Sequence, residues 1–468
     1  MTKEIQQETI RGIALRAKAL GGRAMLVGGC VRDALTGCQS ADIDCEVYGL
    51  APQALRSLAA EFGEVDESGA RYGIFSLRGA GIDLAVPRLE RRTGPKHGDF
   101  DVRLDPALPF ARAAARRDFT VNAIFRDALT GEIVDPFGGR EDLKAGVLRC
   151  VGDPERRFRE DALRILRTLR FAAVLGFAIE PRTAATLHET APLLTYIAPE
   201  RILSEMDRAL CGGHVLPVLL DYPDVLAVFL PEIAPCVGFD QCNRHHIYDV
   251  WGHSAHAAAA IAPEPVLRWT MLLHDVGKPA CFTRDEQGVG HFYGHPAVSA
   301  ELAEGACRRL RMDSRSAERI VTLVRWHDRD IPRTDRAIAR AVGKLGEDVF
   351  RQLLAVKRAD NRAQSPLCRG RAAELDKAGR DVLRKYGYGD YAIHRIGHGQ
   401  GLGRHEEPYL SYNTEIVLQE NMVFTVEPGI YIPGVGGFRH SDTIVVTANG
   451  MENVTEFPRT LDEMTFDI

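Results

Sequence analysis

Hydrophobic and polar positions change their spacing several times along this chain of 468 residues. Apolar residues recur every three to four positions over 4–20 and 51–62, which predicts two amphipathic helices. Shorter apolar runs, typical of strands, occur at 24–28, 42–48, 73–78 and 81–87. A short helix is expected between the first two strands, and a turn at Gly79-Ala80 between the last two. The amino-terminal part is therefore expected to be an α/β head with a mixed sheet.

Helical spacing dominates again from about 155 to 365. Segment 93–110 is rich in Gly, Pro and Asp and predicts a loop. From Tyr386 onward, glycines and β-branched residues alternate with turn signals, which predicts a strand-rich α+β piece. We predict four domains: an α/β head over 1–145, an all-α neck over 146–225, a helical domain over 226–366, and a strand-rich fragment over 369–468.

Composition narrows the class of protein. Hydrophobic residues make up 45% of the chain and charged residues 26%, which is ordinary for a globular protein. The formal charge of −5 argues against a globally basic nucleic-acid binder but leaves room for a local basic surface. Ten cysteines without a CxxC pair predict neither a zinc knuckle nor a disulfide framework. The chain contains no apolar run long enough to span a bilayer, so we expect a cytoplasmic protein without a membrane partner.

Two carboxylates follow a two-glycine turn near the amino terminus. An apolar run enters Gly28-Gly29, and Asp42 and Asp44 lie further along on a predicted strand. Alternate strand residues share a face, so these two carboxylates project together. They repel each other unless a divalent cation lies between them, and a glycine turn lets backbone N–H groups approach phosphate oxygens. The pattern predicts a metal-nucleotide site for nucleotidyl transfer, although a solvated strand edge would also carry such a pair.

Further charged groups extend this candidate site. Asp83 lies in a strand pattern that would place a third carboxylate beside the first two. Arg116-Arg117-Asp118 offers forked donors for phosphate oxygens, or is simply a charged helix start. On a helix, Glu160, Asp161 and Arg164 would lie close together, where an acid and an arginine can read a base edge or form an ordinary salt bridge. Arginines between 156 and 170 add a basic face that could meet RNA.

These motifs resemble one family. The matching pieces are Gly28-Gly29-x-Val31-Arg32-Asp33, Asp42-x-Asp44, Arg116-Arg117-Asp118-Phe119-Thr120-x-Asn122-Ala123, Asp135-Pro136-x-Gly138-Gly139 and Glu160-Asp161-x-x-Arg164. In this order they resemble the CCA-adding enzymes (tRNA nucleotidyltransferases) and the bacterial poly(A) polymerases of the same superfamily, over residues 22 to about 225.

The resemblance implies roles for individual residues. It implies that Asp42 and Asp44 bind Mg²⁺, and that Asp83 is a third catalytic carboxylate. It implies that Gly28, Gly29 and Arg32 contact the triphosphate, and that the same nucleotide pocket includes Arg117, Asp118 and Asn122. Asp161 and Arg164 are expected to pair with the edges of CTP and ATP, so that the protein itself acts as the template. The expected partners are tRNA, CTP and ATP.

A second constellation lies in the predicted helical domain and comprises His253, His274, Asp275, His295, His327 and Asp360. Imidazole and carboxylate ligands suit Mn, Fe, Ni or Mg, so these six residues predict a mono- or dinuclear site for a transition metal or Mg²⁺. His291 and Asp328 are nearby rivals for ligand positions. The run Leu272-Leu273-His274-Asp275-Val276-Gly277-Lys278 resembles the HD phosphohydrolase signature. In some bacterial CCA-adding enzymes such a domain follows the head, which implies phosphatase or 2′,3′-cyclic phosphodiesterase activity.

The carboxyl-terminal fragment resembles a different family. Gly397-His398-Gly399-x-Gly401 and Phe424-Thr425-Val426-Glu427-Pro428-Gly429 are similar to the second half of the pita-bread metallopeptidases. His398 and Glu427 match two of that group's metal ligands, but Ser441 stands at the position of the second glutamate, and the half that carries the two aspartates is absent. We therefore expect no peptidase activity. The usual family tail that grips the tRNA elbow is also missing.

Four functions compete at this stage. The first is addition of CCA, or of the terminal A, to tRNA. The second is poly(A) synthesis by the same chemistry. The third is an HD phosphohydrolase with a relic head, and the fourth is a non-functional chimera. The motif density in the head favours the first.

Overall fold

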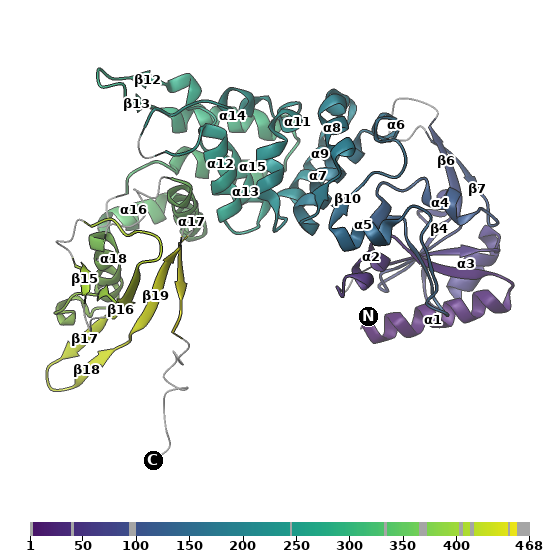
Figure 1. Cartoon of the computed structure of the whole chain (residues 1–468), viewed down its shortest axis with the longest axis horizontal. Helices are drawn as coiled ribbons and strands as arrows, with labels where there is room; N and C mark the ends of the chain where they lie inside the picture. Colours follow the sequence, from purple (N-terminus) through teal and green to yellow (C-terminus); the bar gives the residue numbers. More distant parts are fainter. Residues whose placement is uncertain are drawn as a thin grey trace, which may run out of the picture. The chain divides into compact units, whose positions relative to one another are not determined.

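The computed structural model describes residues 3–38, 42–92, 100–243, 246–331, 335–364, 372–401, 406–411, 416–447 and 450–455. The chain divides into two compact units. One comprises Met1–Ala234, Pro263–Arg268 and Glu304–Glu318, and the other comprises Pro235–Ala262, Trp269–Ala303 and Arg319–Ile468. Figure 1 shows the elements of each unit in sequence colours.

The head is built on a mixed sheet, as the sequence predicts. Its described strands follow the order β3-β4-β5-β2-β1-β8-β9. They are β1 (Arg23–Val27), β2 (Ile43–Tyr48), β3 (Val65–Asp66), β4 (Ile74–Leu77), β5 (Ile82–Ala85), β8 (Phe125–Asp127) and β9 (Ile133–Val134). Strands β2 and β5 run parallel, whereas β1 runs antiparallel to β2 and to β8. The helices of the head are α1 (Lys3–Ala19), α2 (Gly29–Leu35), α3 (Pro52–Ala60), α4 (Phe110–Ala114) and α5 (Gly139–Ala145).

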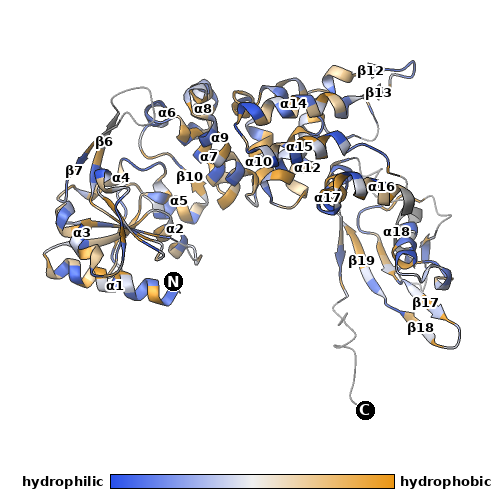
Figure 2. Ribbon diagram, turned by 180° about the vertical axis from the view of Figure 1, so that it is seen from behind, coloured by the Kyte–Doolittle hydropathy of each residue, from blue (hydrophilic) through white to orange (hydrophobic). Residues whose placement is uncertain are grey.

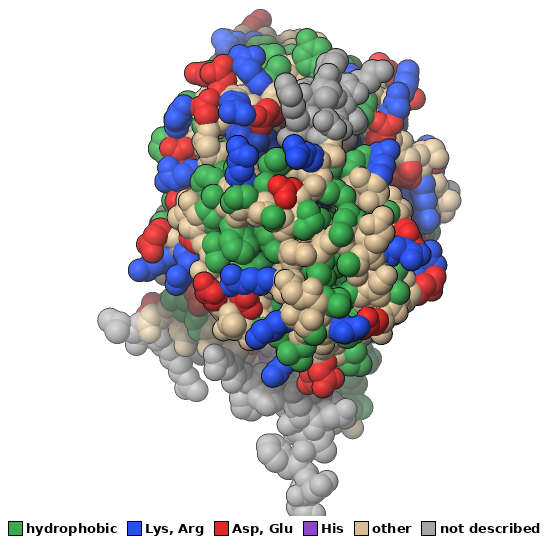
Figure 3. Space-filling view, turned by 90° about the vertical axis from the view of Figure 1, so that its right-hand side faces the viewer, with side chains coloured by type: hydrophobic (Ala, Val, Ile, Leu, Met, Phe, Trp, Pro, Cys, Tyr) green, Lys and Arg blue, Asp and Glu red, His purple; other side chains and the backbone are tan. Residues whose placement is uncertain are grey.

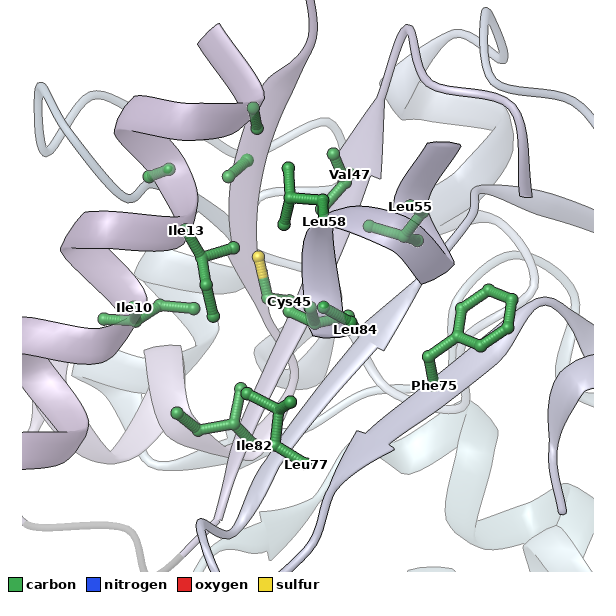
Figure 4. Packing of buried hydrophobic residues seen from close by; sticks show 14 of the residues in the cluster. Ile10, Ile13, Cys45, Val47, Leu55, Leu58, Phe75, Leu77, Ile82 and Leu84 are labelled. Atoms are coloured by element: carbon green, nitrogen blue, oxygen red, sulfur yellow. The ribbon is translucent and has the colours of Figure 1, made fainter. Parts of the chain in front are cut away.

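Apolar and acidic side chains alternate along β2, so one face of the strand is wholly apolar and the other carries the carboxylates of the candidate site. Cys45 and Val47 point into the cluster formed with Ile10, Ile13, Leu55 and Leu58 of α1 and α3 (Figure 4). Because successive strand residues face opposite ways, Asp44 and Glu46 lie on the other face. A second apolar cluster with Met25 and Val27 lies on that other face.

One sequence prediction in the head is wrong. The loop expected over 93–110 contains strand β7 (Phe100–Leu104), which pairs antiparallel with β6 (Arg88–Arg92). Phe100, Val102 and Leu104 alternate with polar residues, which is the period of a strand. The glycine and proline just before them are typical of a loop, and the predicted loop was extended too far along the chain because of them. Residues 93–99 lie outside the described residues.

Helices form the neck, as predicted. They are α6 (Pro154–Glu160), α7 (Leu163–Leu175), α8 (Pro181–Thr190), α9 (Pro199–Leu210), α10 (Val215–Asp221) and α11 (Pro223–Ala227), with short strands β10 (Val147–Leu148) and β11 (Ala178–Ile179). Helices α7 and α9 pack against each other.

Figure 3 views the molecule from the side on which Figure 1 draws the head, and there basic and acidic side chains are interspersed around a mainly apolar centre.

The next region is also helical. It contains α12 (Val250–Ala260), α13 (Pro265–Leu273), α14 (His295–Arg309), α15 (Ser314–Trp326), α16 (Asp335–Leu345) and α17 (Glu347–Ala363), with a small hairpin of β12 (Thr283–Arg284) and β13 (Gly290–His291). Orange and blue positions alternate along many of these helices in Figure 2, which is the amphipathic pattern expected of packed helices.

The carboxyl-terminal fragment is strand-rich, as predicted. After α18 (Ala372–Lys385), the described strands are β14 (Gly397–Gly399), β15 (Glu406–Leu410), β16 (Val423–Val426), β17 (Gly429–Ile432), β18 (Gly436–Arg439), β19 (Asp442–Thr447) and β20 (Gly450–Asn453). They form a sheet of order β15-β14-β16-β19-β20 and a β17-β18 hairpin. Among the described residues, none of the helices is at once long and apolar enough to cross a bilayer.

Candidate functional site

The two-glycine turn connects β1 to α2 and lies directly against the carboxylate face. Gly28 has a φ of 74°, in the region that favours glycine. A Cβ atom at this position would lie 3.1 Å from Nη1 of Arg117 and 3.3 Å from Oδ2 of Asp44. Any side chain here would therefore crowd both charged groups, and the bare backbone keeps the pocket open beside them.

Three predicted catalytic carboxylates lie on this face of the sheet. Asp44 and Asp83 are direct partners across the parallel β2–β5 ladder, and Asp42 lies one residue before β2. Loss of hydration raises the pKa of Asp44 above its ordinary value, Arg117 opposes this effect, and the charges of Asp83 and Asp42 add to it. Asp83 and Asp42 are thus close enough to destabilise the charge of Asp44, which is the arrangement that a bound cation relieves.

Two of these acids, Asp44 and Asp83, line a pocket of about 190 Å³. Charged residues provide most of its polar wall, namely Asp44, Glu46, Asp83, Arg88, Arg116 and Arg117. A cavity with acids on one wall and guanidinium groups on another can hold a cation and phosphate oxygens side by side.

Glu46 is a functional residue that our sequence reasoning missed. Its side chain is buried, with a relative exposure of 1%, and one carboxylate oxygen accepts hydrogen bonds from Nη2 of Arg116 at 2.6 Å and Nη2 of Arg117 at 2.9 Å. Although burial opposes ionisation, Arg117 and Arg116 hold the pKa of Glu46 below its ordinary value. The sequence could have predicted this position, because Asp42, Asp44 and Glu46 are spaced two residues apart, as side chains on one face of a strand are.

The predicted nucleotide residues Arg32, Asp118 and Asn122 form one hydrogen-bond network. Nη1 of Arg32 donates to Oδ1 of Asn122 at 2.8 Å, and Nδ2 of Asn122 donates to Oδ1 of Asp118 at 3.2 Å. Nε and Nη2 of Arg167 donate to the other Asp118 oxygen at 2.9 and 2.5 Å. Although burial opposes ionisation, Arg167 holds the pKa of Asp118 below its ordinary value. Arg167 is a second residue that the sequence reasoning missed.

Asp161 and Arg164 lie at a break in the helix rather than on one continuous helix, so the expected helical placement of this motif is wrong. Helix α6 ends at Glu160, Asp161 has an extended backbone, and α7 starts at Leu163. Asp161 leaves the helix because its carboxylate accepts a hydrogen bond from the Leu163 amide at 3.1 Å. Arg164 donates to the Arg116 carbonyl at 3.1 Å and so reaches the head segment.

The six residues predicted in the helical domain come together around Asp275. Nε2 of His253 lies 3.4 Å and Nε2 of His274 3.3 Å from Oδ2 of Asp275. Nε2 of His295 lies 3.2 Å and Nε2 of His327 3.4 Å from Oδ1. The described residues therefore offer two groups of potential metal ligands that share Asp275. Asp360 completes the first group, since its Oδ1 lies 2.8 Å from Nε2 of His253.

The orientation of the imidazoles fits divalent cations. The Nδ1 atoms of His253, His274, His295 and His327 each contact a backbone carbonyl oxygen, at distances of 2.7 to 3.3 Å. Nδ1 therefore carries a proton, and Nε2 faces inward, where it can bind a metal ion once it is deprotonated. Although burial opposes ionisation, Asp275 and Asp360 raise the pKa of His274 to about 10, so a proton on this ring balances the carboxylates when no metal is bound, and a divalent cation would replace that proton. His274 and Lys278 counter the effect of burial and hold the pKa of Asp275 well below its ordinary value.

The two rival ligands lie outside this cluster. His291 pairs with Asp285 at 2.8 Å on the β12–β13 hairpin, and Asp328 is exposed. His246, which is not among the predicted ligands, has its ring centroid 5.2 Å from that of His253. Burial and the charge of Lys278 lower the pKa of His246 to about 3, so it is neutral beside the cluster.

The peptidase-like fragment keeps a pocket of about 460 Å³ lined by His398 and Glu427, among other residues. Nε2 of His398 lies 3.6 Å from Oε1 of Glu427, and the Ser441 hydroxyl donates to the same oxygen at 3.1 Å. Ser441 thus lies beside Glu427 but brings no charge. In the described part of the fragment, no third histidine, cysteine or acid joins these two into a ligand group.

The fold and the two sites define the class of this protein as a nucleotidyltransferase of the poly(A) polymerase type joined to an HD domain. The family models that match this chain name the same domains in the same order along the sequence. The poly(A) polymerase head domain matches residues 24–149, a probable RNA- and SrmB-binding site of polymerase A matches 176–237, and the HD domain matches 244–364. Metallopeptidase family M24 matches 336–448, which confirms the resemblance of the last fragment.

Curated relatives identify the family. A multifunctional CCA protein of Nitrosococcus oceani is 34% identical over 313 residues, which cover 65% of this chain and 74% of the relative. An A-adding tRNA nucleotidyltransferase of Deinococcus radiodurans is 36% identical over 354 residues, which cover 73% and 76%. This chain belongs to the family of CCA-adding enzymes, the tRNA nucleotidyltransferases.

Solved structures share the fold. The Bacillus stearothermophilus CCA-adding enzyme in complex with CTP has a TM-score of 0.52 at 24% identity, covering 83% of this chain and 89% of that chain. A tRNA nucleotidyltransferase complexed with a primer tRNA and an incoming ATP analogue has a TM-score of 0.55 at 21% identity, covering 80% and 99%.

Proposed function

We propose that this protein transfers nucleotides from CTP and ATP to the 3′ end of tRNA and releases pyrophosphate. The observation that carries the proposal is the position of Asp44, opposite Asp83 on the sheet and against the bare backbone of Gly28. Membership of the CCA-adding family supports tRNA as the acceptor. The net charge of −5 leaves RNA binding to local basic groups rather than to the charge of the whole chain.

The head residues fit Mg²⁺, because the mutual repulsion of Asp42, Asp44 and Asp83 is what a cation relieves. Asp42 and Asp44 would hold it, and bound Mg²⁺ supplies positive charge for the triphosphate and the leaving pyrophosphate. The chain's own part is to orient the substrate. Arg116 and Arg117, fixed by Glu46, offer guanidinium donors to phosphate oxygens at the pocket wall.

Base selection is assigned to Asp161 and Arg164 at the α6–α7 break. A carboxylate and a guanidinium together present acceptors and donors that can pair with the edge of cytosine or adenine. Arg164 uses part of its fork on the carbonyls of Arg157 and Arg116, and this fixes the direction of the remaining N–H groups. The protein thus substitutes for a nucleic-acid template.

Arg164→Ala is expected to reduce the preference for CTP and ATP over UTP and GTP by about 10-fold or more, the equivalent of about 1–3 kcal/mol for a lost bidentate base contact. Single-nucleotide incorporation with each labelled triphosphate measures the preference. Arg156→Ala is the matched control, because Arg156 is an exposed arginine of the preceding helix. Unchanged selectivity in Arg164→Ala would remove this residue from the base-reading site.

The proposal as a whole is tested with tRNA that lacks its 3′-CCA. Incubation with each labelled triphosphate should give incorporation of both C and A at the 3′ end. Incorporation of A only on tRNA that already ends in CC would make the protein A-adding, as the Deinococcus relative is named. Addition of A tracts to any RNA end would instead indicate a poly(A) polymerase, and no incorporation would refute the proposal.

A second activity is supported by the HD cluster. We propose that it hydrolyses phosphate esters such as RNA 2′,3′-cyclic phosphates. His253, His274, Asp275 and Asp360 would hold one divalent transition metal or Mg²⁺ ion, with His295, His327 and the shared Asp275 holding a second. Bound metal supplies an activated water at neutral pH. Lys278, whose ammonium lies 2.6 Å from Asp275, adds a positive charge that can attract the phosphate.

The peptidase-like fragment is expected to be inactive. Two ligands, His398 and Glu427, cannot hold a dinuclear centre, and Ser441 supplies a hydroxyl where a glutamate would be needed. Incubation of the full chain with Mn²⁺ or Co²⁺ and peptides bearing amino-terminal Met or Xaa-Pro should release no more product than metal alone. Hydrolysis that disappears in Glu427→Gln would contradict this expectation, because only this protein's own site would explain it.

A further inference from the structure

We propose that Arg167 is a positioning residue that couples recognition of the base to alignment of the triphosphate in the head. The inference rests on the proposed nucleotidyl transfer. Arg167 lies on α7, three residues after Arg164, so the two side chains emerge from neighbouring positions on the helix. Unlike Arg164, it donates from Nε and Nη2 to a carboxylate oxygen of the head, Oδ2 of Asp118, while its Nη1 lies 3.9 Å from Glu205.

The Asp118 carboxylate is a structural hub rather than a free nucleotide contact. Its side chain is buried, with a relative exposure of 8%. One oxygen accepts hydrogen bonds from the Phe119 amide at 2.9 Å and from Asn122, and the other accepts both Arg167 bonds. A nucleotide would have to displace protein partners to reach it. Asp118 therefore acts on the substrate through the groups that it holds.

Three arginines of α6 and α7 clamp the backbone or side chains of the short head segment 116–118. Nη2 of Arg157 donates to the Arg117 carbonyl at 2.7 Å, and Nη2 of Arg164 donates to the Arg116 carbonyl at 3.1 Å. Arg167 adds the bidentate bond to the side chain of Asp118. The guanidinium groups of Arg116 and Arg117, which line the pocket beside Asp44, thus project from a backbone fixed by the proposed base-reading element.

The same hub reaches the other phosphate contact. Asn122 donates to Asp118 and accepts from Arg32, which stems from α2 directly after the two-glycine turn. The guanidinium groups of Arg32 and Arg167 lie 5.4 and 5.5 Å from the centre of the Phe171 ring. A shift of α7 in response to the bound base would therefore move both Arg32 and segment 116–118. Small displacements of such positioning groups can change rates by about 100-fold.

Arg167→Met removes the clamp and keeps most of the side-chain volume. Arg170→Met is the matched control, because Arg170 lies three residues further along α7, forms a buried ion pair with Glu205 at 3.0 Å and contacts Phe171, but makes no bond to Asp118. Arg167→Lys restores a single charged contact to Asp118 and is expected to recover part of the lost function. If Arg167→Met and Arg170→Met lose the same amount of thermal stability, that loss measures the packing of α7 and not the bond to Asp118.

The test measures equilibrium binding of ATP, CTP, UTP, GTP and inorganic tripolyphosphate to the full chain with Mg²⁺, followed by single-turnover addition to tRNA. In Arg167→Met, we expect the preference for ATP and CTP over UTP and GTP to fall about 10-fold, and kcat to fall by up to about 100-fold. Tripolyphosphate affinity should change less than about 3-fold, because Glu46 still holds the guanidinium groups of Arg116 and Arg117 at the pocket wall. Arg170→Met should keep the wild-type preference.

Wild-type preference in Arg167→Met, or an equal loss in Arg170→Met, would overturn the coupling. The binding measurement separates this outcome from failure of the proposed function. A wild-type protein that selects ATP and CTP but adds nothing to tRNA refutes the transfer and leaves the coupling intact if Arg167→Met loses that selection. A wild-type protein that binds all four triphosphates equally, or none, overturns both proposals.

Discussion

Asp44→Asn is expected to lower nucleotide addition by at least about 100-fold, the scale observed when a group that stabilises transition-state charge is removed. The carboxylate lies at the centre of the proposed site, between Asp83 on the neighbouring strand and the backbone of Gly28. Asparagine keeps the shape and removes the charge, so substrate positioning by Arg116 and Arg117 is preserved. Single-turnover addition of labelled CMP and AMP to tRNA measures the loss.

The same variant is expected to be more stable than the wild type when no metal is bound. The folded protein raises the pKa of Asp44 above its ordinary value of 3.8, so this group favours folding at low pH. That contribution is lost as pH rises through the folded pKa, and at pH 7 the ionised carboxylate costs a small amount of stability, because water screens this exposed side chain. Asparagine cannot ionise and avoids this cost. Thermal unfolding in a chelator at pH 4 and pH 7 should show a gain for Asp44→Asn only at pH 7.

Magnesium provides an independent readout. A ligand that binds only the folded state raises the unfolding temperature, and the rise grows with the logarithm of its concentration divided by its Kd. Mg²⁺ should therefore stabilise the wild type and have little effect on Asp44→Asn. Asp66→Asn is the matched control, because Asp66 lies on β3 at the edge of the same sheet. Near-normal addition by Asp44→Asn would show that Asp44 does not hold the reacting centre.

The carboxylate face shows what could be predicted from local sequence. Strand alternation was sufficient to place Asp42 and Asp44 on one face, and the same alternation would have included Glu46. The pairing of Asp44 with Asp83 follows from the parallel neighbours β2 and β5, which the strand runs alone do not specify. Sequence spacing therefore identifies which side chains share a strand face, whereas strand order decides which carboxylates meet.

The break between α6 and α7 shows where the prediction from local sequence was wrong. A continuous helix through Glu160, Asp161 and Arg164 agreed with their spacing, but the Asp161 carboxylate bonds the Leu163 amide and breaks the helix there. Asp118 and Arg167 meet across 49 positions of sequence. No periodicity links two such residues, so only the packing of α7 against the head segment reveals the hub. The six residues of the HD cluster were likewise predicted from the sequence, but spacing did not predict that two ligand groups share Asp275.

Asp275→Asn is expected to lower hydrolysis of 2′,3′-cyclic AMP by at least about 100-fold, because even groups one shell behind metal ligands cost about 10- to 100-fold. Asp275 is the one residue common to both ligand groups in the described part of the chain. Nucleotide addition to tRNA should stay within about 2-fold of wild type, since the head carries its own carboxylates and does not depend on this cluster. His291→Ala is the control, because His291 pairs with Asp285 outside the cluster.

Metal content separates a shared site from two independent ones. The wild type purified with Mn²⁺ should hold up to two ions in the HD cluster, and Asp275→Asn should lose both, since each group contains this carboxylate. His327→Asn touches the second group alone and should lose one. His327→Asn also leaves Lys278 paired with Asp275. This variant therefore tests the second metal site without the folding defect that an unpaired buried Lys278 could cause in Asp275→Asn. Retention of one ion by Asp275→Asn would mean that a group binds without the shared carboxylate. Loss of hydrolysis in Asp44→Asn would instead place the phosphohydrolase chemistry in the head, where Asp275 has no part.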